Sequence, residues 1–460
     1  MLSSLRISHF KAWTDTDKIR LAPLTVIFGS NSAGKSSLGH LLLALKQTAI
    51  SSDRHRALHL GDGNALIDLG TFSDCLHHHD TSKPLRFKIQ WQLPKSLDVR
   101  DPQDKQKAWS GNDLSLSVAL RANEKTGQPE TESVKYILRS DSGGRLDASF
   151  VRDEKNAYAL KSDQYQFVRS IGRKWPLEEP DKFYRVSDAT RARFKNADFL
   201  SDLALETESM LERLYFLGPL REPPQRTYQW SGDTPNDVGP KGEFSIAAIL
   251  AAKAQGRKLN RGPRKHQLEF DAFIAEWLKD LGIIESFSVR AVAEGRKEFE
   301  VLVRSKSDSA EVKITDVGFG VSQVLPALVE AFYCPRNSTV WMEQPEIHLH
   351  PQVQAELADA FISAIRSREN GVPRNVQLIV ESHSEHFLNR LQRRIAEGAI
   401  EPSEVAIYFC SNLAGAAELQ ELRVNLFGDI ENWPNNFFGN EMADLTARTV
   451  AASKRRSHMG

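Results

Sequence analysis

An eight-residue loop near the amino terminus constrains the fold of this chain more than any other segment. Residues 29–36 read Gly-Ser-Asn-Ser-Ala-Gly-Lys-Ser and fit the pattern G-x-x-x-x-G-K-S/T without a mismatch. The apolar run 24–28 precedes the loop, and leucines recur at helical spacing after it, at positions 38, 41, 42 and 45. The sequence therefore predicts a buried strand, a glycine-rich loop and an amphipathic helix, in that order.

The same loop predicts a phosphate-binding site. Its glycines allow backbone amides to turn inward around phosphate oxygens, and the start of the following helix adds favourable partial charge there. Lys35 would reach the β- and γ-phosphates of a nucleotide, and the Ser36 hydroxyl would take a position on Mg²⁺. We predict nucleotide contacts for the loop and the serine after it: Gly29, Ser30, Asn31, Ser32, Ala33, Gly34, Lys35, Ser36 and Ser37.

A carboxylate at the end of a second apolar run completes the predicted magnesium site. The run 339–342 is followed by Glu-Gln-Pro-Glu at 343–346. Proteins with such a phosphate loop hold Mg²⁺ through a carboxylate at the end of a neighbouring buried strand. We therefore predict that Glu343 and Ser36 hold the metal.

Hydrophobic periodicity divides the rest of the chain into two kinds of structure. The runs 87–91, 114–118 and 134–138 alternate with period two and predict an antiparallel meander, and 286–304 predicts a hairpin. In the last third, buried strands alternate with helices, which predicts a parallel sheet covered by helices. The expected strands are 338–342, 376–380 and 405–409, and the expected helices are 322–333, 353–366 and 385–397.

The predicted fold class is α/β, with a mainly parallel, helix-covered sheet, an antiparallel β arm and a helical insertion. We expect one discontinuous lobe from 1–79 and 311–460, in which 410–460 is a carboxyl-terminal extension. The region 80–310 is expected to be inserted into it, with antiparallel strands and helices.

Composition limits the partners of the chain. Lys plus Arg and Asp plus Glu are 60 each, so a basic field over the whole molecule is excluded. A contact with nucleic acid would need a local patch, for which the basic loop 253–265 is a candidate. The three cysteines lie far apart, and no apolar stretch approaches the roughly 20 residues of a membrane span. We expect no membrane association and a cytoplasmic location.

Three motifs together resemble the head of an ABC-type ATPase. They are the loop 29–37, the run Glu-Gln-Pro-Glu-Ile-His-Leu-His-Pro at 343–351, and Glu-Ser-His-Ser-Glu-His-Phe-Leu at 381–388. The group they resemble most is the OLD-like, SMC-related AAA ATPases of bacterial anti-phage defence loci. Residues 316–323 resemble the signature loop of these heads, and 218–224 and 432–438 are also similar to this group.

The resemblance implies a head that dimerises, or forms a higher homo-oligomer, around ATP and Mg²⁺. Each nucleotide would lie between the phosphate loop of one subunit and the signature loop of the other, where Gly318, Gly320 and Ser322 would contact it. His383 occupies the position of the switch histidine, which bonds the γ-phosphate. A separate effector protein, such as a nuclease, would act with the head.

One position departs from the pattern of these heads. They place a carboxylate directly after the magnesium carboxylate to activate water, and here that position is Gln344. Either Glu346 or another group substitutes, or Gln344 orients water, or the protein hydrolyses ATP slowly and works as an ATP-held clamp. The predicted catalytic set is Glu343, Gln344, Glu346 and His383.

The sequence leaves two alternatives to an ATP-driven switch. One is a nearly inactive scaffold in which bound ATP holds an assembly together. The other is an OLD-like nuclease, for which Glu381 after a strand is a superficial match. No Asp-x-Asp follows it, and the nuclease is the less favoured interpretation.

Overall fold

The computed structural model describes residues 1–434 and 447–451, with the exception of single positions within the first range. Those positions are Asn64, Gln103, Ser142, Glu154, Lys174, Pro263, Arg264, Phe319 and Ala414. The end of the similar segment 432–438 and the centre of the expected signature loop therefore lie outside the described residues.

A six-stranded sheet forms the middle of the molecule. Its strands, in spatial order, are β10 (Leu214–Leu217), β17 (Thr339–Glu343), β20 (Gln377–Glu381), β4 (Leu24–Gly29), β21 (Val405–Leu413) and β22 (Ala416–Leu422). Neighbours from β10 to β21 pair in parallel, and β22 pairs antiparallel with β21. The carboxyl ends of β4, β20 and β17 therefore meet at one edge of the sheet.

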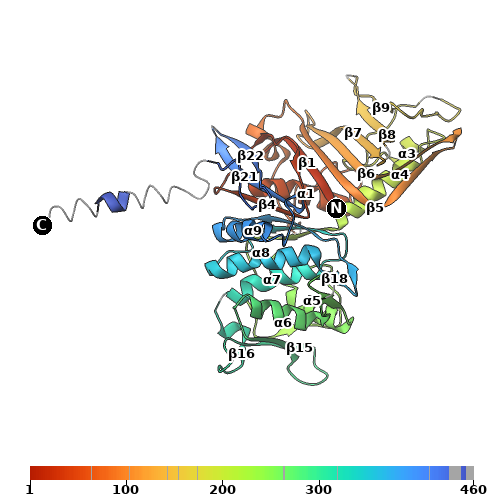
Figure 1. The fold of residues 1–460 in the computed structure, drawn as a ribbon. Helices are drawn as coiled ribbons and strands as arrows, with labels where there is room; N and C mark the ends of the chain where they lie inside the picture. The colour runs from red at the N-terminus through yellow and green to blue at the C-terminus, as the bar shows by residue number, and fades with distance from the viewer. Residues whose placement is uncertain are drawn as a thin grey trace.

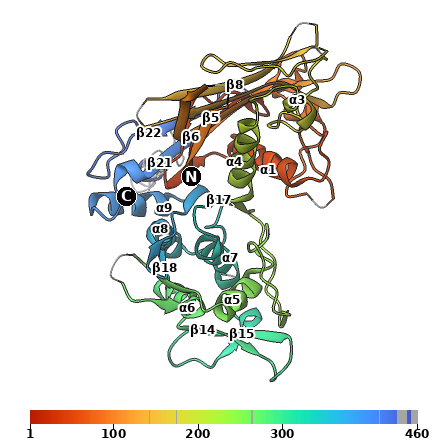
Figure 2. The same ribbon diagram turned by 90° about the vertical axis from the view of Figure 1, so that its right-hand side faces the viewer.

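Helices cover both faces of this sheet, and one face is shared with a second sheet. On one side lie α7 (Gly320–Tyr333), α8 (Pro351–Arg366) and α9 (Glu385–Ala396), with α5 (Ser245–Ala254) and α6 (Phe270–Asp280) beyond them (Figures 1 and 2). On the other side α1 (Lys35–Ile50) and α4 (Phe199–Glu212) pack between the two sheets. Apolar side chains of the parallel sheet thus alternate between two cores.

The second sheet is long and antiparallel. Its spatial order is β2 (Trp13–Asp15), β1 (Leu2–Phe10), β5 (Leu85–Asp101), β6 (Asp104–Ala122), β7 (Pro129–Arg139), β8 (Arg145–Arg152) and β9 (Tyr158–Lys161), and β3 (Ile19–Arg20) also pairs with β1. Burial alternates from Leu85 to Leu93 of β5, which shows that one face packs on the core there and the other faces outward.

Smaller elements complete the chain. Two further helices are α2 (Phe72–Cys75) and α3 (Asp188–Arg191). One small sheet has β11 (Tyr228–Gln229), β14 (Ser286–Ala291), β15 (Glu298–Arg304) and β16 (Val312–Lys313), and another has β12 (Lys258–Asn260), β13 (Leu268–Glu269), β18 (Arg368–Glu369) and β19 (Val372–Pro373). Short 3₁₀ turns span His77–His79, Ile314–Asp316 and Pro402–Glu404.

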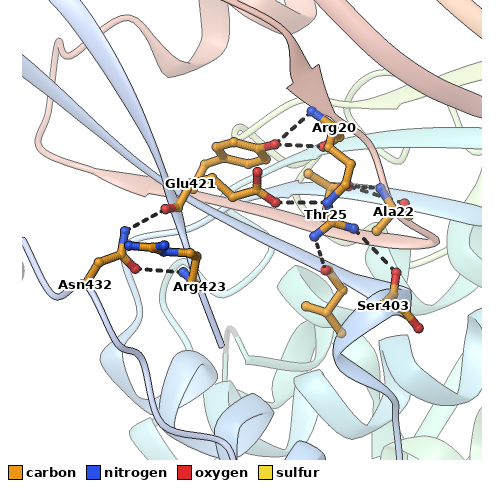
Figure 3. A network of polar contacts seen from close by, with 9 residues as sticks. Arg20, Ala22, Thr25, Ser403, Glu421, Arg423 and Asn432 are labelled. Carbon is orange, nitrogen blue, oxygen red and sulfur yellow. Dashed lines mark hydrogen bonds and ion pairs between the residues drawn. The ribbon is translucent and has the colours of Figure 1, made fainter. Parts of the chain in front are cut away.

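Polar contacts join the amino-terminal strands to the carboxyl-terminal ones. Arg20 Nε lies 2.9 Å from Glu421 Oε1, and Arg20 Nη2 donates to the Val405 carbonyl at 2.7 Å (Figure 3). Asn432 donates to the Glu421 carbonyl and accepts from the Arg423 amide. Both ends of the described main range therefore belong to the body that carries β4.

The expected α/β class, the meander, the hairpin and the alternating strands and helices of the last third are confirmed. The division at residues 79 and 80 stays a prediction, although β1 pairs with β5 across it and β10 joins the parallel sheet. Among the described helices, none is both long and apolar enough to cross a bilayer.

Candidate functional site

Two glycines shape the phosphate loop between β4 and α1. Gly29 has φ of 148°, and a Cβ there would lie 2.1 Å from the carbonyl oxygen of Cys410 on β21. Gly34 caps α1 with φ of 99°, a left-handed conformation that costs glycine little. The Ser37 hydroxyl accepts from Trp13 Nε1 at 2.8 Å and donates to the Gly34 carbonyl, so it holds the loop.

The Lys35 ammonium is held inside the loop. Its Nζ donates to the carbonyls of Gly29 and Ser30 at 2.9 and 2.8 Å, and the residue is 6% exposed. Burial lowers the pKa of Lys35, while the nearby carboxylates of Glu381 and Glu346 act in the opposite direction. A phosphate group at this loop would supply the strong anionic partner that backbone carbonyls replace only in part.

Ser36 bonds a carboxylate from the neighbouring strand. Its Oγ donates to Glu381 Oε2 at 2.7 Å, and Trp341 Nε1 donates to Glu381 Oε1 at 2.9 Å. Trp341 reaches this place because α1 has Gly39 there, where a Cβ would lie 2.3 Å from the indole ring. Burial and the charge of Glu343 raise the pKa of Glu381 to about 8.

Glu343 lies beside Glu381, since the two residues are paired in the parallel register of β17 and β20. It is 5% exposed, and its Oε1 accepts no hydrogen bond from the described residues, with His40 Nε2 at 3.4 Å. Two buried carboxylates and the Ser36 hydroxyl offer the oxygen ligands that Mg²⁺ prefers. These residues fit a magnesium ion that keeps several waters, and no larger His, Cys, Asp and Glu cluster is found among the described residues.

Glu346 and His383 form a second pair at the same edge. Glu346 Oε1 accepts from the Ser382 hydroxyl at 2.8 Å and from the His383 amide at 2.7 Å. Burial raises the pKa of Glu346, and burial followed by the charge of Lys35 lowers the pKa of His383. Glu346 Oε2 and His383 Nε2 are buried and have no hydrogen-bond partner among the described residues.

Arg221, in the loop after β10, brings a buried cation to these carboxylates. Its Nη2 donates to the Glu343 carbonyl at 3.4 Å, whereas Nε and Nη1 find no partner among the described residues. Burial lowers the pKa of Arg221 to about 10, against the opposing charges of Glu343 and Glu346. A guanidinium with unused donors beside a phosphate loop is suited to bind a phosphate oxygen.

Gln344 and the expected signature loop differ in their placement from Glu343, Glu346 and His383. The backbone of Gln344 turns away from β17 with φ of 45°, and its backbone N–H donates to the Glu381 backbone carbonyl at 2.9 Å. Gly320 begins α7, and added Cβ atoms at Gly318 and Gly320 would meet open space. The structure thus brings together the phosphate loop, Glu343, Glu346 and His383, whereas the signature-loop contacts stay a prediction.

Known protein families match two segments of the chain. Residues 247–388 match the family described as "AAA ATPase domain", and residues 400–447 match "Protein of unknown function (DUF3696)". The first match contains Glu343, Glu381 and His383 but not the phosphate loop. It indicates an ATPase that binds ATP and Mg²⁺. No curated protein matches the sequence.

Solved structures similar to this chain include SMC heads. The SMC head domain from Thermotoga maritima is 11% identical with a TM-score of 0.39, over 92% of this chain and 99% of that one. The SmcHead bound to the C-winged helix domain of ScpA has the same identity and TM-score, over 92% and 98%. A third is the Smc head domain with an extended coiled coil bound to the C-terminal domain of ScpA derived from Pyrococcus furiosus, 10% identical with a TM-score of 0.37, over 92% and 96%.

Sequence reasoning missed three members of the site. In the sequence, Glu381 falls in the motif 381–388 and in the nuclease alternative, with no role predicted at the magnesium site, and Arg221 falls only in the similar segment 218–224. Trp341 was counted as part of an apolar run. A signal existed for Glu381, because a charged residue that ends a buried strand next to a phosphate loop faces the same sheet edge as Glu343.

Proposed function

We propose that this ATPase is a nucleotide-controlled switch or clamp, in which two heads pair around ATP and Mg²⁺. The observation that supports it best is the meeting of Lys35, Ser36, Glu343 and Glu381 at one sheet edge, with Ser36 bonded to Glu381 at 2.7 Å. A cation, a hydroxyl and two buried carboxylates suit the phosphates and metal of one nucleotide. When Mg²⁺ is bound there, it neutralises charge that develops on the phosphates.

Within that proposal the chain's own residues divide the work. Lys35 and Arg221 bind phosphate oxygens, Ser36 and Glu343 hold the metal, and Glu381 orients the Ser36 hydroxyl. The ring of His383, whose Nε2 has no hydrogen-bond partner among the described residues, bonds the γ-phosphate in this proposal. Gln344 orients the attacking water but cannot take its proton, so turnover is slow.

The resemblance of the motifs supports a setting in anti-phage defence or DNA surveillance, with a separate effector protein. In this proposal ATP binding assembles the heads, and slow hydrolysis sets how long the effector is held. Gly318 is exposed and Gly320 half-buried at the start of α7, and a Cβ added at either would meet no atom of the described residues within 4 Å, which supports pairing.

Pairing is tested by measuring the mass of the protein in solution with and without ATP and Mg²⁺. We expect a monomer without nucleotide and a dimer or higher oligomer with it. Gly320→Arg should bind ATP normally, because an added Cβ meets open space, but should block pairing and turnover. Gly63→Arg, at another glycine with open space, is the matched control. Normal turnover by a strictly monomeric Gly320→Arg protein would contradict the shared site.

The scaffold is the second candidate, and the absence of a carboxylate at Gln344 favours it. A steady-state hydrolysis assay separates the two, since a scaffold binds ATP without measurable turnover. The nuclease is less well supported, because both carboxylate oxygens of Glu381 are bonded by Ser36 and Trp341 within the ATPase sheet.

A further inference from the structure

The antiparallel sheet carries a row of cations and hydroxyls across its outer face. The strand register pairs Arg6 with Lys88, Lys88 with Ser117, Ser117 with Lys135, Lys135 with Ser149 and Ser149 with Lys161. We call these six residues, one each from β1, β5, β6, β7, β8 and β9, the basic row. It holds four cations, two serines and no acidic residue, and five strand spacings of about 4.8 Å give it a length of roughly 24 Å.

The basic row faces away from the core. Along β5 the buried residues Leu85, Phe87 and Ile89 alternate with Arg86 and Lys88, which point to the opposite face. A shallow hollow of about 450 Å³ lies over the row. Its lining includes row members Arg6, Lys88, Ser117, Lys135 and Ser149.

Acidic neighbours neutralise the row only in part. Asp15 and Asp17 pair with Arg6 at 2.8 and 3.7 Å, and the buried Asp147 lies 4.0 Å from Lys135. Burial lowers the pKa of Lys88, and so do the neighbouring cations Arg139, Lys18 and Arg6, whereas the charge of Asp113 acts in the opposite direction. The centre of the row is therefore a place where positive charges repel one another and an added anion is stabilising.

The basic loop singled out in the sequence differs in this respect. Lys253 pairs with Asp271 at 2.6 Å, Arg257 with Glu369 at 2.6 Å, and Arg261 with Asp280 at 2.5 Å. The Arg257 and Arg261 guanidiniums also lie over aromatic rings. These side chains bind neighbouring elements of their own chain, so nucleic-acid binding by 253–265 stays a prediction with weaker support than the row.

We propose that the basic row binds the sugar-phosphate backbone of double-stranded nucleic acid. A line of cations and hydroxyls fits an extended polyanion better than a single phosphate, which needs converging groups. Duplex DNA carries one negative charge per about 1.7 Å of axis, so a row of this length meets several phosphates. The row contains no aromatic side chain, whereas proteins that bind single strands stack bases on aromatic rings.

The proposed partner of the ATPase is thus a nucleic-acid duplex. Only the link between duplex binding and the ATP-controlled switch rests on the proposed function. Binding is measured by fluorescence anisotropy with a labelled 30-base-pair DNA duplex at several salt concentrations, with and without ATP and Mg²⁺. If all four cations contact phosphates, the logarithm of affinity falls with the logarithm of salt with a slope of about −3 to −4.

Lys88→Gln with Lys135→Gln tests the row. We expect about tenfold weaker duplex binding near 0.1 M salt and a slope smaller by about 2, because two phosphate contacts are lost. Lys297→Gln with Lys306→Gln is the matched control, since it removes the same charge from exposed positions around β15. If the first pair fails to fold, Arg6→Gln with Lys161→Gln, at exposed positions of the row, replaces it.

Three results would overturn the proposal. They are a duplex affinity that is equal in the row variant and its control, an equal or higher affinity for a 30-nucleotide single strand, and an absence of duplex binding by the wild-type protein. ATP affinity is measured in every variant, so that loss of the nucleotide site is distinguished from loss of the row.

Discussion

The sheet edge that carries Lys35, Ser36, Glu343 and Glu381, here called the nucleotide edge, differs from the basic row in how its charges are arranged. The nucleotide edge is formed where parallel strands end, and the basic row by the register of antiparallel strands. At the nucleotide edge, buried groups of both signs converge, and Glu343, Glu346 and His383 retain buried atoms with no hydrogen-bond partner among the described residues. On the outer sheet face, exposed and half-buried cations are spread along a line. Buried charged groups that converge on one point suit a small, highly charged ligand. Cations spread along a line suit a long polyanion.

The difference predicts contrasting responses to solvent. Charges near the surface are screened within a Debye length of about 8 Å at physiological salt, and buried pairs are screened much less. Salt should therefore weaken duplex binding far more than ATP binding.

Removing the buried cation should have the largest effect. Lys35→Ala should weaken ATP binding by about 100-fold or more, because hydrogen bonds to charged groups contribute about 1.5–3 kcal/mol each. Isothermal titration calorimetry measures this loss. Duplex binding without nucleotide should not change, since Lys35 bonds the Gly29 and Ser30 carbonyls and belongs to the other region.

An unaltered ATP affinity in Lys35→Ala would remove the phosphate-loop assignment. A parallel loss of duplex affinity without nucleotide would instead break the comparison, because it would show that the two regions share a ligand. The melting temperature of the variant is the control for folding.

Much of the fold follows from period and length. The strand β4 and the helix α1 are predicted by the run 24–28, the loop and the leucines after it. Alternation along 87–91, 114–118 and 134–138 predicts three strands of the antiparallel sheet. The sequence could not predict that β1 joins the arm rather than the parallel sheet, because pairing between distant strands leaves no local pattern.

The sequence predicts those site residues that belong to a local motif. It does not predict the residues that reach the site only because of the spatial order of the strands. Lys35, Ser36 and Glu343 followed from spacing. Glu381 depends on β20 lying between β17 and β4, and Arg221 depends on β10 lying at the edge beside β17. The basic row depends on the register of six strands. Its neighbouring members come from separate parts of the sequence, so no local pattern reveals the row.

A smaller effect is expected from restoring a carboxylate at position 344. Gln344→Glu should raise the single-turnover rate of hydrolysis by about tenfold or more, because a general base contributes about 10²–10⁴ when it is well placed. Glu346→Gln separates this from the idea that Glu346 activates water. A slower Gln344→Glu enzyme together with an inactive Glu346→Gln enzyme would assign the base to Glu346.

The smallest effect concerns pH, which should act on the buried edge. The pKa of Glu381 is about 8 in the folded chain, above the ordinary value of 4.5. Between those values the folded state binds a proton that the unfolded state has lost, so stability falls as pH rises toward 8. Without nucleotide, the melting temperature should fall by about 1–3 °C from this group between pH 6 and 8.5.

Glu381→Gln should flatten that dependence, because an amide does not titrate in this range. Glu330 in α7 is the matched control, since burial also raises its pKa to about 8, yet it accepts from the Val238 amide in the core, away from the phosphate loop. Both Glu→Gln variants should remove part of the slope. ATP with Mg²⁺ should reduce only the part due to Glu381, because a bound cation stabilises its ionised form. A nucleotide effect that survives in Glu381→Gln and disappears in Glu330→Gln would contradict the assignment.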